Sequence, residues 1–192
     1  MLDKNVPYVD VLMHRKKDAP IPVIKLPDNF SFSFFQSGDE KEWAKIEASV
    51  LEFPDELNAL IYFQKNYLPF ISELEKRCLF IENEKGEKVA TSTAWWNYTG
   101  NRRDPWLHWV AVKPQYQNLG LGKAVISKIT QRMTEIEGNR DFYLHTQTWS
   151  HRAIKLYEKL GYVITDEKGL SKYSNEDFDK AMAILDKIYA VK

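Results

Sequence analysis

The sequence predicts one α/β domain in which helices flank a mixed β-sheet. Short segments such as 29–36 alternate aromatic and polar residues, which is typical of strands with one buried face. Between 121 and 136, apolar residues recur instead at the spacing of one helix face. A turn with Pro114 and Gly120 joins a strand to this helix. At 192 residues the chain is long enough to fill a single core.

The first half of the chain is expected to form strands at its beginning and then two helices. Residues 37–39 form a turn that can cap the first helix, and Pro54 breaks that helix. Pro69 ends or kinks the second helix. In chain order, we expect an extra strand at 6–13, an extended proline-bearing connection at 16–27, a strand at 29–36, a helix marked by Trp43, Ile46, Val50 and Leu51, and a helix marked by Leu57, Leu60 and Ile61.

The second half is expected to alternate strands and helices. A polar stretch at 97–105 is predicted to be a loop. The final helix is predicted to be capped near Ser174 or Asn175, with Asp177 in its first turn. The expected elements are strands at 78–82 and 89–96 around a hairpin loop at 83–87, a strand at 106–112, the helix at 121–136, a strand at 141–148, a helix at 150–160, a short strand at 162–165 and the final helix around 178–189.

Composition limits the partners that the chain is expected to have. Lys plus Arg and Asp plus Glu each number 27, so a nucleic-acid partner has no electrostatic support. The four histidines are scattered without the spacing of metal ligands, so we expect no metal site. No apolar run is long enough to span a bilayer, so no membrane partner is expected. The single cysteine, Cys78, cannot form an intrachain disulfide and fits the cytoplasm.

The stretch from Val112 to Gly122 predicts a site for a pyrophosphate. A strand, a turn and a glycine-bearing loop lead there into a helix, whose first N–H groups and dipole favour an anion. Glycine at 120 and 122 would let a phosphate approach the backbone. The loop matches neither the G-x-x-x-x-G-K-[ST] spacing nor G-x-G-x-x-G.

This stretch, V-x-P-x-x-Q-x-x-G-x-G, resembles the acetyl-CoA loop of the GNAT-superfamily N-acetyltransferases. A second family element follows at the expected distance, because 150–162 resembles N-x-x-A-x-x-x-Y-x-x-x-G-[FY]. A generic strand–helix unit would explain one such match. Two matches in order, with a strand between them, favour the family.

The resemblance implies the GNAT fold, with a sheet splayed between the fourth and fifth core strands. Within a single domain at 1–192 it assigns 29–165 to the core, 1–28 to an N-terminal extension and 166–192 to an extra C-terminal helix. The family usually supplies a last strand at that end, which often helps to shape the acceptor site.

The resemblance also implies an activity: transfer of an acetyl group from acetyl-CoA, the cosubstrate, directly to a small primary amine, without a metal. Alternatives are a longer acyl group, a protein amine as acceptor, or a non-catalytic CoA-binding module. A homodimer is left open. The cofactor-binding residues carried over are Val110, Ala111, Val112, Gln117, Asn118, Leu119, Gly120, Leu121, Gly122, Lys123 and Ser150. Ser150 replaces the usual asparagine and could instead only cap its helix.

Two residues are the catalytic candidates. Tyr157 occupies the tyrosine position of the second element, where a phenol with a pKa near 10 suits donation to the departing thiolate. A packed core tyrosine is the alternative. His108 lies in a run, 107–112, similar to L-H-A-L-A-V of the arylalkylamine N-acetyltransferases, where this histidine helps to take the amine proton. The second histidine of those enzymes is Trp106 here, and a structural role for His108 is equally open.

The acceptor site is expected to be aromatic and acidic. Four tryptophans, at 95, 96, 106 and 109, divide between core and cleft. His145 could line the cleft or be a half-buried strand residue, and Arg102 and Arg103 could meet phosphates or simply face solvent. Carboxylates on or near the first two helices would suit a cationic amine, although a charged helix face is the ordinary explanation: Glu47, Glu52, Asp55 and Glu56.

Overall fold

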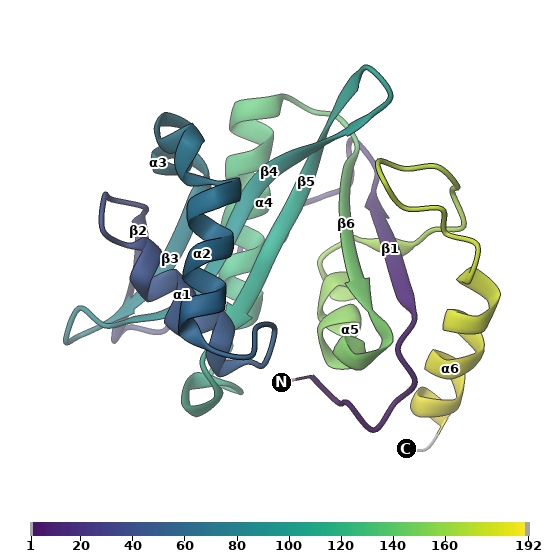
Figure 1. Cartoon of the computed structure of the whole chain (residues 1–192), viewed down its shortest axis with the longest axis horizontal. Helices are drawn as coiled ribbons and strands as arrows, with labels where there is room; N and C mark the ends of the chain where they lie inside the picture. The colour runs from purple at the N-terminus through teal and green to yellow at the C-terminus, as the bar shows by residue number, and fades with distance from the viewer. Residues whose placement is uncertain (1, 191–192) are drawn as a thin grey trace.

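The computed structural model describes residues 2–190 and contains one seven-stranded sheet with helices on both faces (Figure 1). β5 and β6 run parallel, whereas the other neighbouring strands are antiparallel. The predicted mixed sheet is therefore confirmed. In spatial order the strands are β2 (Phe30–Phe34), β3 (Cys78–Asn83), β4 (Lys88–Thr99), β5 (Arg102–Val112), β6 (Phe142–Gln147), β1 (Asp10–Arg15) and β7 (Val163–Ile164). Residues 1, 191 and 192 of the predicted terminal segments lie outside the described residues.

Residues 2–190 contain six α-helices and three 3₁₀ turns, all of which lie between strands except α6, which follows the last one. Pro69 lies in the turn η1 (Leu68–Phe70) and separates two helices, as expected. The last helix begins at Phe178, so the predicted cap near Ser174 or Asn175 is wrong. Asn175 has a φ of 58° and instead donates its side-chain amide to the carbonyls of Thr165 and Glu167. The helices are α1 (Glu40–Ser49), α2 (Glu56–Asn66), α3 (Ile71–Arg77), α4 (Leu121–Glu137), α5 (His151–Lys159) and α6 (Phe178–Ala190); the other turns are η2 (Pro114–Tyr116) and η3 (Thr148–Ser150).

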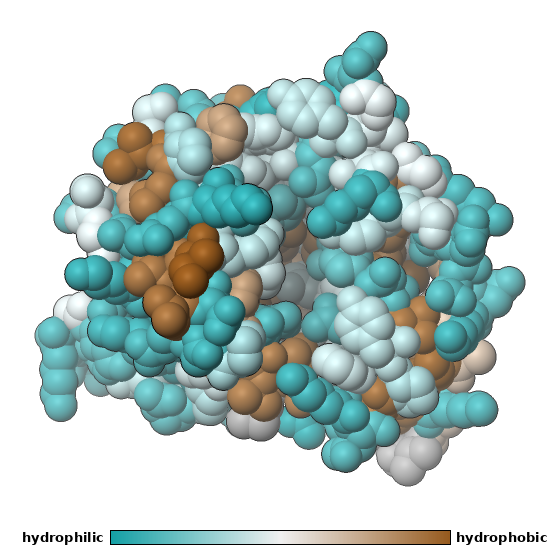
Figure 2. All heavy atoms as spheres, viewed as in Figure 1, coloured by the Kyte–Doolittle hydropathy of each residue, from teal (hydrophilic) through white to brown (hydrophobic). Residues whose placement is uncertain are grey.

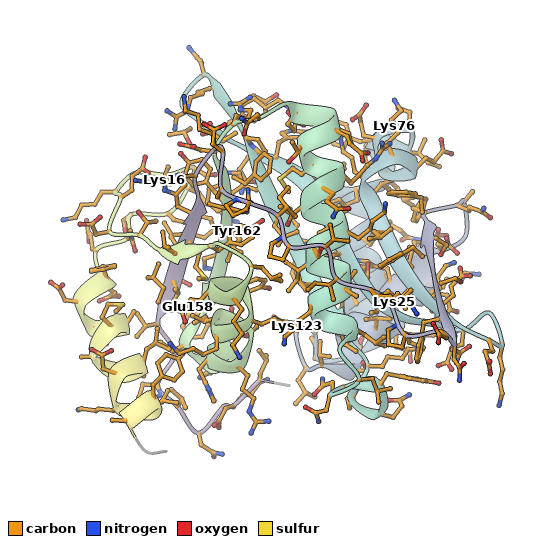
Figure 3. All side chains as sticks on the ribbon, turned by 180° about the vertical axis from the view of Figure 1, so that it is seen from behind. Lys16, Lys25, Lys76, Lys123, Glu158 and Tyr162 are labelled. Carbon is orange, nitrogen blue, oxygen red and sulfur yellow. The ribbon has the colours of Figure 1, made fainter. Side chains whose placement is uncertain are left out.

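The sheet is buried on both faces, and the described residues form two large hydrophobic cores and a smaller cluster of Leu12, Trp106, Tyr143 and Leu170. Successive strand residues point to opposite faces. On β3, Leu79 and Ile81 join the core under α4, α5 and α6, whereas Cys78 and Phe80 join the core under α1, α2 and α3. Seen from behind, the extended connection at 16–27 crosses α4 (Figure 3), where the Ser127 hydroxyl donates to the Pro22 carbonyl.

The predicted polar loop at 97–105 is wrong, because β4 and β5 continue through it as a hairpin to the pair Thr99 and Arg102. Its polar residues find partners within the structure. The Arg103 guanidinium lies 4.5 Å from the Trp96 ring and 2.9 Å from the Glu137 carboxylate. These contacts compensate for the lack of apolar residues that a strand normally shows.

The strand β1 fills the place between β6 and β7 and is antiparallel to both. Residues predicted as an N-terminal extension therefore form an interior strand. The last strand that the family usually supplies has no counterpart after β7 in residues up to 190, where the expected C-terminal helix, α6, follows instead.

The predicted splay lies between β5 and β6. These strands pair only at Trp106 with Tyr143 and at Leu107 with Leu144, and beyond that point they diverge (Figure 1). The divergence opens the middle of the sheet, and the candidate site lies there.

Candidate active site

A bulge in β5 shapes the centre of the site. Thr91 pairs with Ala111 and Thr93 with His108, so β5 contains one residue more than β4. Trp109 absorbs the extra length with a φ of 52°, which is rare for a residue other than glycine. Because β6 has already diverged, the edge of β5 from His108 to Val112 has no strand partner on that side within residues 2–190. An unpaired edge of this kind can bind an extended ligand through its backbone.

Two cavities open from this edge and meet. One, the acceptor cavity, has a volume of about 580 Å³, and the other, the cofactor groove, has about 450 Å³. The space-filling view shows the hollow between the α1–α2 side and the β6–β1 side of the molecule (Figure 2). Both cavities are lined by Leu2, Glu52, Val110, Ser150, Ala153 and Tyr157. A ligand in the groove can therefore reach a ligand in the acceptor cavity at this junction.

The cofactor groove contains the start of α4. Gly120, with a φ of 85°, lets the chain turn into the helix, whose first N–H groups have no partner within the helix itself. Most residues predicted to bind the cofactor line this groove: Val110, Ala111, Val112, Gln117, Asn118, Gly120, Gly122, Lys123 and Ser150. The Gln117 amide also donates to the Val112 carbonyl at 2.9 Å, which ties the loop to the end of β5.

Three of the residues predicted to bind the cofactor differ from the others in the position of their side chains or in their packing. Leu121 is buried in the core, and Leu119 is exposed, so neither side chain lines the groove. At Gly122, an added Cβ would lie 3.1 Å from a methyl group of Leu156, so this glycine permits the close packing of α4 on α5. The prediction that this glycine also gives room to a phosphate stays a prediction, since Gly122 lines the groove as well.

Basic side chains of α5 were missed by the sequence reasoning. Arg152, Lys155 and Lys159 line the groove together with Lys123 from α4. Their spacing of three and four residues places them on one helix face, and this signal was available in the sequence. Four cations beside a helix N-terminus suit a ligand that carries several phosphates.

Ser150 stands at the N-cap position of α5, but its side chain makes no capping hydrogen bond. The interpretation of Ser150 as a cap is therefore wrong. Its hydroxyl lies at the junction of the two cavities, where it can contact a ligand.

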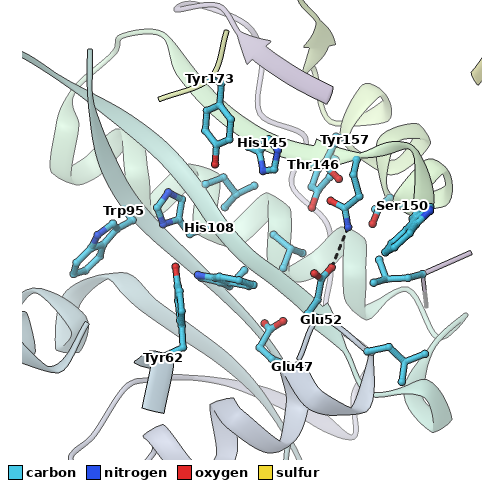
Figure 4. Close-up of a pocket in the computed structure, with 18 of the residues that line it drawn as sticks. Glu47, Glu52, Tyr62, Trp95, His108, His145, Thr146, Ser150, Tyr157 and Tyr173 are labelled. Carbon is cyan, nitrogen blue, oxygen red and sulfur yellow. Dashed lines mark hydrogen bonds between the residues drawn. The ribbon is translucent and has the colours of Figure 1, made fainter. Parts of the chain in front are cut away.

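Tyr157 lies at the same junction, on the face of α5 turned toward the sheet (Figure 4). Burial raises the pKa of its phenol far above the ordinary value, with a smaller contribution from Glu52 and Glu47. Tyr157 therefore holds its proton at neutral pH and is a weak but well-placed acid.

His108 lines the acceptor cavity, but its environment argues against a role as base. Burial lowers the pKa of the imidazole to about 3, so it is neutral at physiological pH. Trp109 Nε1 donates to the Tyr67 hydroxyl at 2.8 Å, and that hydroxyl lies 2.7 Å from His108 Nδ1. Since burial raises the pKa of Tyr67 well above 10, we assign its proton as donated to Nδ1. His108 then carries its own proton on Nε2, so neither ring nitrogen is free to accept one.

Only two of the four predicted acidic residues line the acceptor cavity. Asp55 caps α2 by accepting from the Asn58 N–H at 2.8 Å, and Glu56 is exposed. Glu47 and Glu52 line the cavity instead, and burial raises the pKa of both carboxyls, most strongly at Glu47. Gln147 donates weakly to Glu52 at 3.4 Å, the dashed line in Figure 4.

The comparisons with known proteins agree with this geometry. The family model described as "Acetyltransferase (GNAT) family" matches residues 41–162, which contain the phosphate loop, the junction and α5. The chain belongs to the GNAT family. Membership makes acyl transfer the type of reaction to expect. None of the curated proteins matches the chain.

Solved GNAT structures share the fold at low identity. A GCN5-related N-acetyltransferase from Sphaerobacter thermophilus superposes with a TM-score of 0.66 at 19% identity, over 83% of this chain and 49% of that one. An acetyltransferase of the GNAT family from Colwellia psychrerythraea gives 0.59 at 12%, over 83% and 54%. A GCN5-related N-acetyltransferase from Kribbella flavida gives 0.55 at 20%, over 82% and 56%. This chain spans about half the length of these chains.

The remaining predicted residues of this GNAT site have structural partners. Arg102 pairs with Asp104 at 2.8 Å, and Arg103 pairs with Glu137. Neither arginine lines the cofactor groove. His145 does line the acceptor cavity. Its Nε2 is hydrogen-bonded to the Asp10 carboxylate at 2.8 Å, and the Tyr173 ring stacks on its imidazole. Between residues 2 and 190 there is no group of three or more side chains that could hold a metal ion. No helix in the same range has both the length and the apolar character needed to cross a membrane.

Proposed function

We propose that this GNAT domain transfers the acetyl group of acetyl-CoA directly to a small primary amine. The meeting of the two cavities at Val110, Ser150 and Tyr157 is the observation that carries the proposal. In this arrangement the basic groove holds the phosphates of CoA, the free edge of β5 receives the pantetheine arm, and the acceptor cavity holds the amine.

The chemistry at the junction follows from the groups that face it. In this proposal, a backbone N–H of β5 near Val110 stabilises the oxyanion that forms when the amine attacks the thioester carbon. As the C–S bond breaks, the Tyr157 hydroxyl gives its proton to the thiolate. The raised pKa of Tyr157 supports this role, because the donor is protonated at neutral pH.

Two observations favour direct transfer to a small acceptor. Cys78 is buried, lines neither cavity and has its pKa raised to about 12, so it is a poor nucleophile for an acyl-enzyme. A cavity of about 580 Å³ fits a small molecule better than a protein surface. The free thiol also suits a reducing compartment such as the cytoplasm.

The test is a panel of amines with acetyl-CoA, read by thiol release. We expect acetyl-CoA and CoA to raise Tm, and at least one amine with an apolar or aromatic body to be acetylated. Tight CoA binding without turnover over a broad panel would favour a non-catalytic module instead. A higher kcat/KM for a peptide amine would overturn the small-amine acceptor. A higher kcat/KM for a longer acyl-CoA would overturn acetyl-CoA as the donor.

A further inference from the structure

One carboxylate in the acceptor cavity is buried without a partner. Glu47, on the inner face of α1, is only 1% exposed and lines the cavity. Its Oε1 has no hydrogen-bond partner among residues 2–190. A buried carboxylate that lacks a partner is destabilising, so its presence at a cavity wall points to a ligand that supplies the missing donor.

The groups around Glu47 are acidic or neutral. Four of them are coupled to it electrostatically: Glu52 from the segment after α1, Tyr67 from the end of α2, Cys78 from β3 and Tyr157 from α5. Burial raises the pKa of each, so the phenols and the thiol stay uncharged at neutral pH. Lys4 and Lys172 also line the cavity, but no basic side chain among the described residues contributes to the shifted pKa of Glu47.

Aromatic rings complete the wall beside this carboxylate. Tyr62, Tyr67 and Trp109 line the same cavity (Tyr62 is labelled in Figure 4). The Tyr62 and Trp109 rings lie 5.2 Å apart, and the Tyr67 hydroxyl is hydrogen-bonded to Trp109. Aromatic faces attract an ammonium group, and they exclude an anion.

From these contacts we infer that Glu47, together with Tyr62, Tyr67 and Trp109, forms a binding site for the ammonium group of the acceptor, and that Glu47 accepts the proton which that group must lose. This inference rests on the proposed function and names the acceptor class: a primary ammonium attached to an apolar or aromatic body.

The proton balance assigns one role to each group. The ammonium gives a proton to the Glu47 carboxylate, which passes it to solvent through the open side of the cavity. The neutral amine then forms the N–C bond, and the C–S bond breaks as Tyr157 protonates the sulfur. As the amide forms, the nitrogen loses a second proton. This proton passes through water to the Tyr157 phenolate and restores the phenol. The net products are the amide, the CoA thiol and one proton.

The variant Glu47→Gln keeps the size of the side chain and removes its charge. The probes are 2-phenylethylamine and its uncharged analogue 2-phenylethanol, each bound to the CoA complex, with Kd measured by calorimetry. We expect the wild-type complex to prefer the amine, and Glu47→Gln to reduce that preference by about 10- to 100-fold. We also expect kcat/KM for the amine to fall by roughly 10²–10⁴-fold, while the Kd of CoA is unchanged.

A second readout is stability as a function of pH. A raised carboxyl pKa means that the folded state holds more protons than the unfolded state above pH 4.5, so the wild type loses stability as pH rises. Glu47→Gln removes this loss. Its Tm relative to the wild type should therefore increase between pH 5 and pH 8, a result that simple damage to the fold would not give.

Glu56→Gln is the matched control, because Glu56 is an exposed carboxylate at the start of the neighbouring helix. It should leave the amine preference, turnover and pH dependence unchanged. Failure of the wild type to acetylate any amine would overturn the proposed function. An unchanged amine preference in Glu47→Gln, or no preference in the wild type, would overturn this inference and leave the assignment of the cofactor groove intact.

Discussion

At the scale of single residues, burial changes the proton affinity of the acids and of the base in the site in opposite directions. Low polarity disfavours whichever form is charged, so the pKa of an acid rises and that of a base falls. Tyr157 and Glu47 accordingly hold protons more tightly than in water, whereas His108 holds one far less tightly. The raised pKa keeps the Tyr157 phenol protonated and available as a donor, and it makes the ionised carboxylate of Glu47 a stronger base. The lowered pKa of His108 favours a neutral, fixed hydrogen-bonding group.

Tyr157→Phe tests the donor. Removing the hydroxyl should lower kcat by roughly 10²–10⁴-fold, because the thiolate then leaves without a positioned acid, while CoA affinity stays nearly constant. Steady-state rates and thermal shift measure the two effects. Tyr162→Phe is the control, since Tyr162 is fully buried and lines neither cavity. Full turnover by Tyr157→Phe, with chemistry limiting the rate, would assign Tyr157 to packing.

His108→Asn tests whether the imidazole titrates during catalysis. With a pKa of about 3, His108 is neutral throughout the range from pH 5 to pH 9 and cannot produce a limb in the rate profile there. The profile of kcat/KM should therefore keep its shape in the variant, with a loss of roughly 10-fold or less from the broken hydrogen bond to Tyr67. Disappearance of an acid limb in His108→Asn would show instead that the imidazole takes the proton.

At the level of secondary structure, two helix starts converge on the groove, one from α4 and one from α5. Gly122 allows α4 to pack closely on Leu156 of α5, and this contact brings Lys123 and the basic face of α5 to one place. We therefore expect the affinity of the groove for phosphates to depend on helix packing as well as on the loop.

Lys123→Glu tests this charge. Lys123 lies at the start of α4 (Figure 3), and an exposed ionic contact contributes about 0.2–1 kcal/mol, so reversal of the charge should raise the Kd of CoA roughly 2- to 30-fold. The loss should shrink at high salt. Lys128→Glu, on the same helix but outside the groove, should leave the Kd unchanged. Equal effects of the two variants would contradict a local role for Lys123.

Sequence patterns predicted most elements, and they were wrong where tertiary contacts decide. Periodicity identified the central strands and α4 because each has one apolar repeat. The hairpin at 97–105 has no such repeat. Its Arg103 instead contacts Glu137 of α4 and the Trp96 ring of β4, and its Arg102 pairs with Asp104. In the same way, Glu47 was one of four acidic candidates, and only the packing of α1 against the cavity distinguishes it from Asp55 and Glu56.

For the molecule as a whole, the N-terminal strand is part of the central sheet. β1 lies between β6 and β7, and α6 packs over it, with Val9, Val11 and Met13 in the main core. Residues before β1 reach the site as well, because Leu2, Lys4 and Tyr8 line the acceptor cavity. The position of β1 therefore affects both the stability of the core and the shape of the acceptor cavity.

Met13→Ala tests this connection. Met13 is fully buried, so its truncation should lower the free energy of unfolding by about 2–5 kcal/mol, in a single transition that also releases bound CoA. Denaturant unfolding followed by circular dichroism and by tryptophan fluorescence measures this. Lys16→Ala, at an exposed position just after β1, should change stability by about 0.5 kcal/mol or less. A change equally small in Met13→Ala would show that β1 is only loosely attached.

The place of β1 also has a consequence for synthesis on the ribosome. Val9 and Thr148, which are hydrogen-bonded in the folded protein, lie 139 residues apart in sequence. At about 5–20 residues per second, β1 waits roughly 7–28 s before β6 exists to pair with it. Its apolar centre, Val11 to Met13, is bordered by Asp10, His14 and Arg15, and such polar neighbours hinder pairing with other nascent chains. The charges at the two ends of β1 thus protect the strand during translation, before they have any partner in the fold.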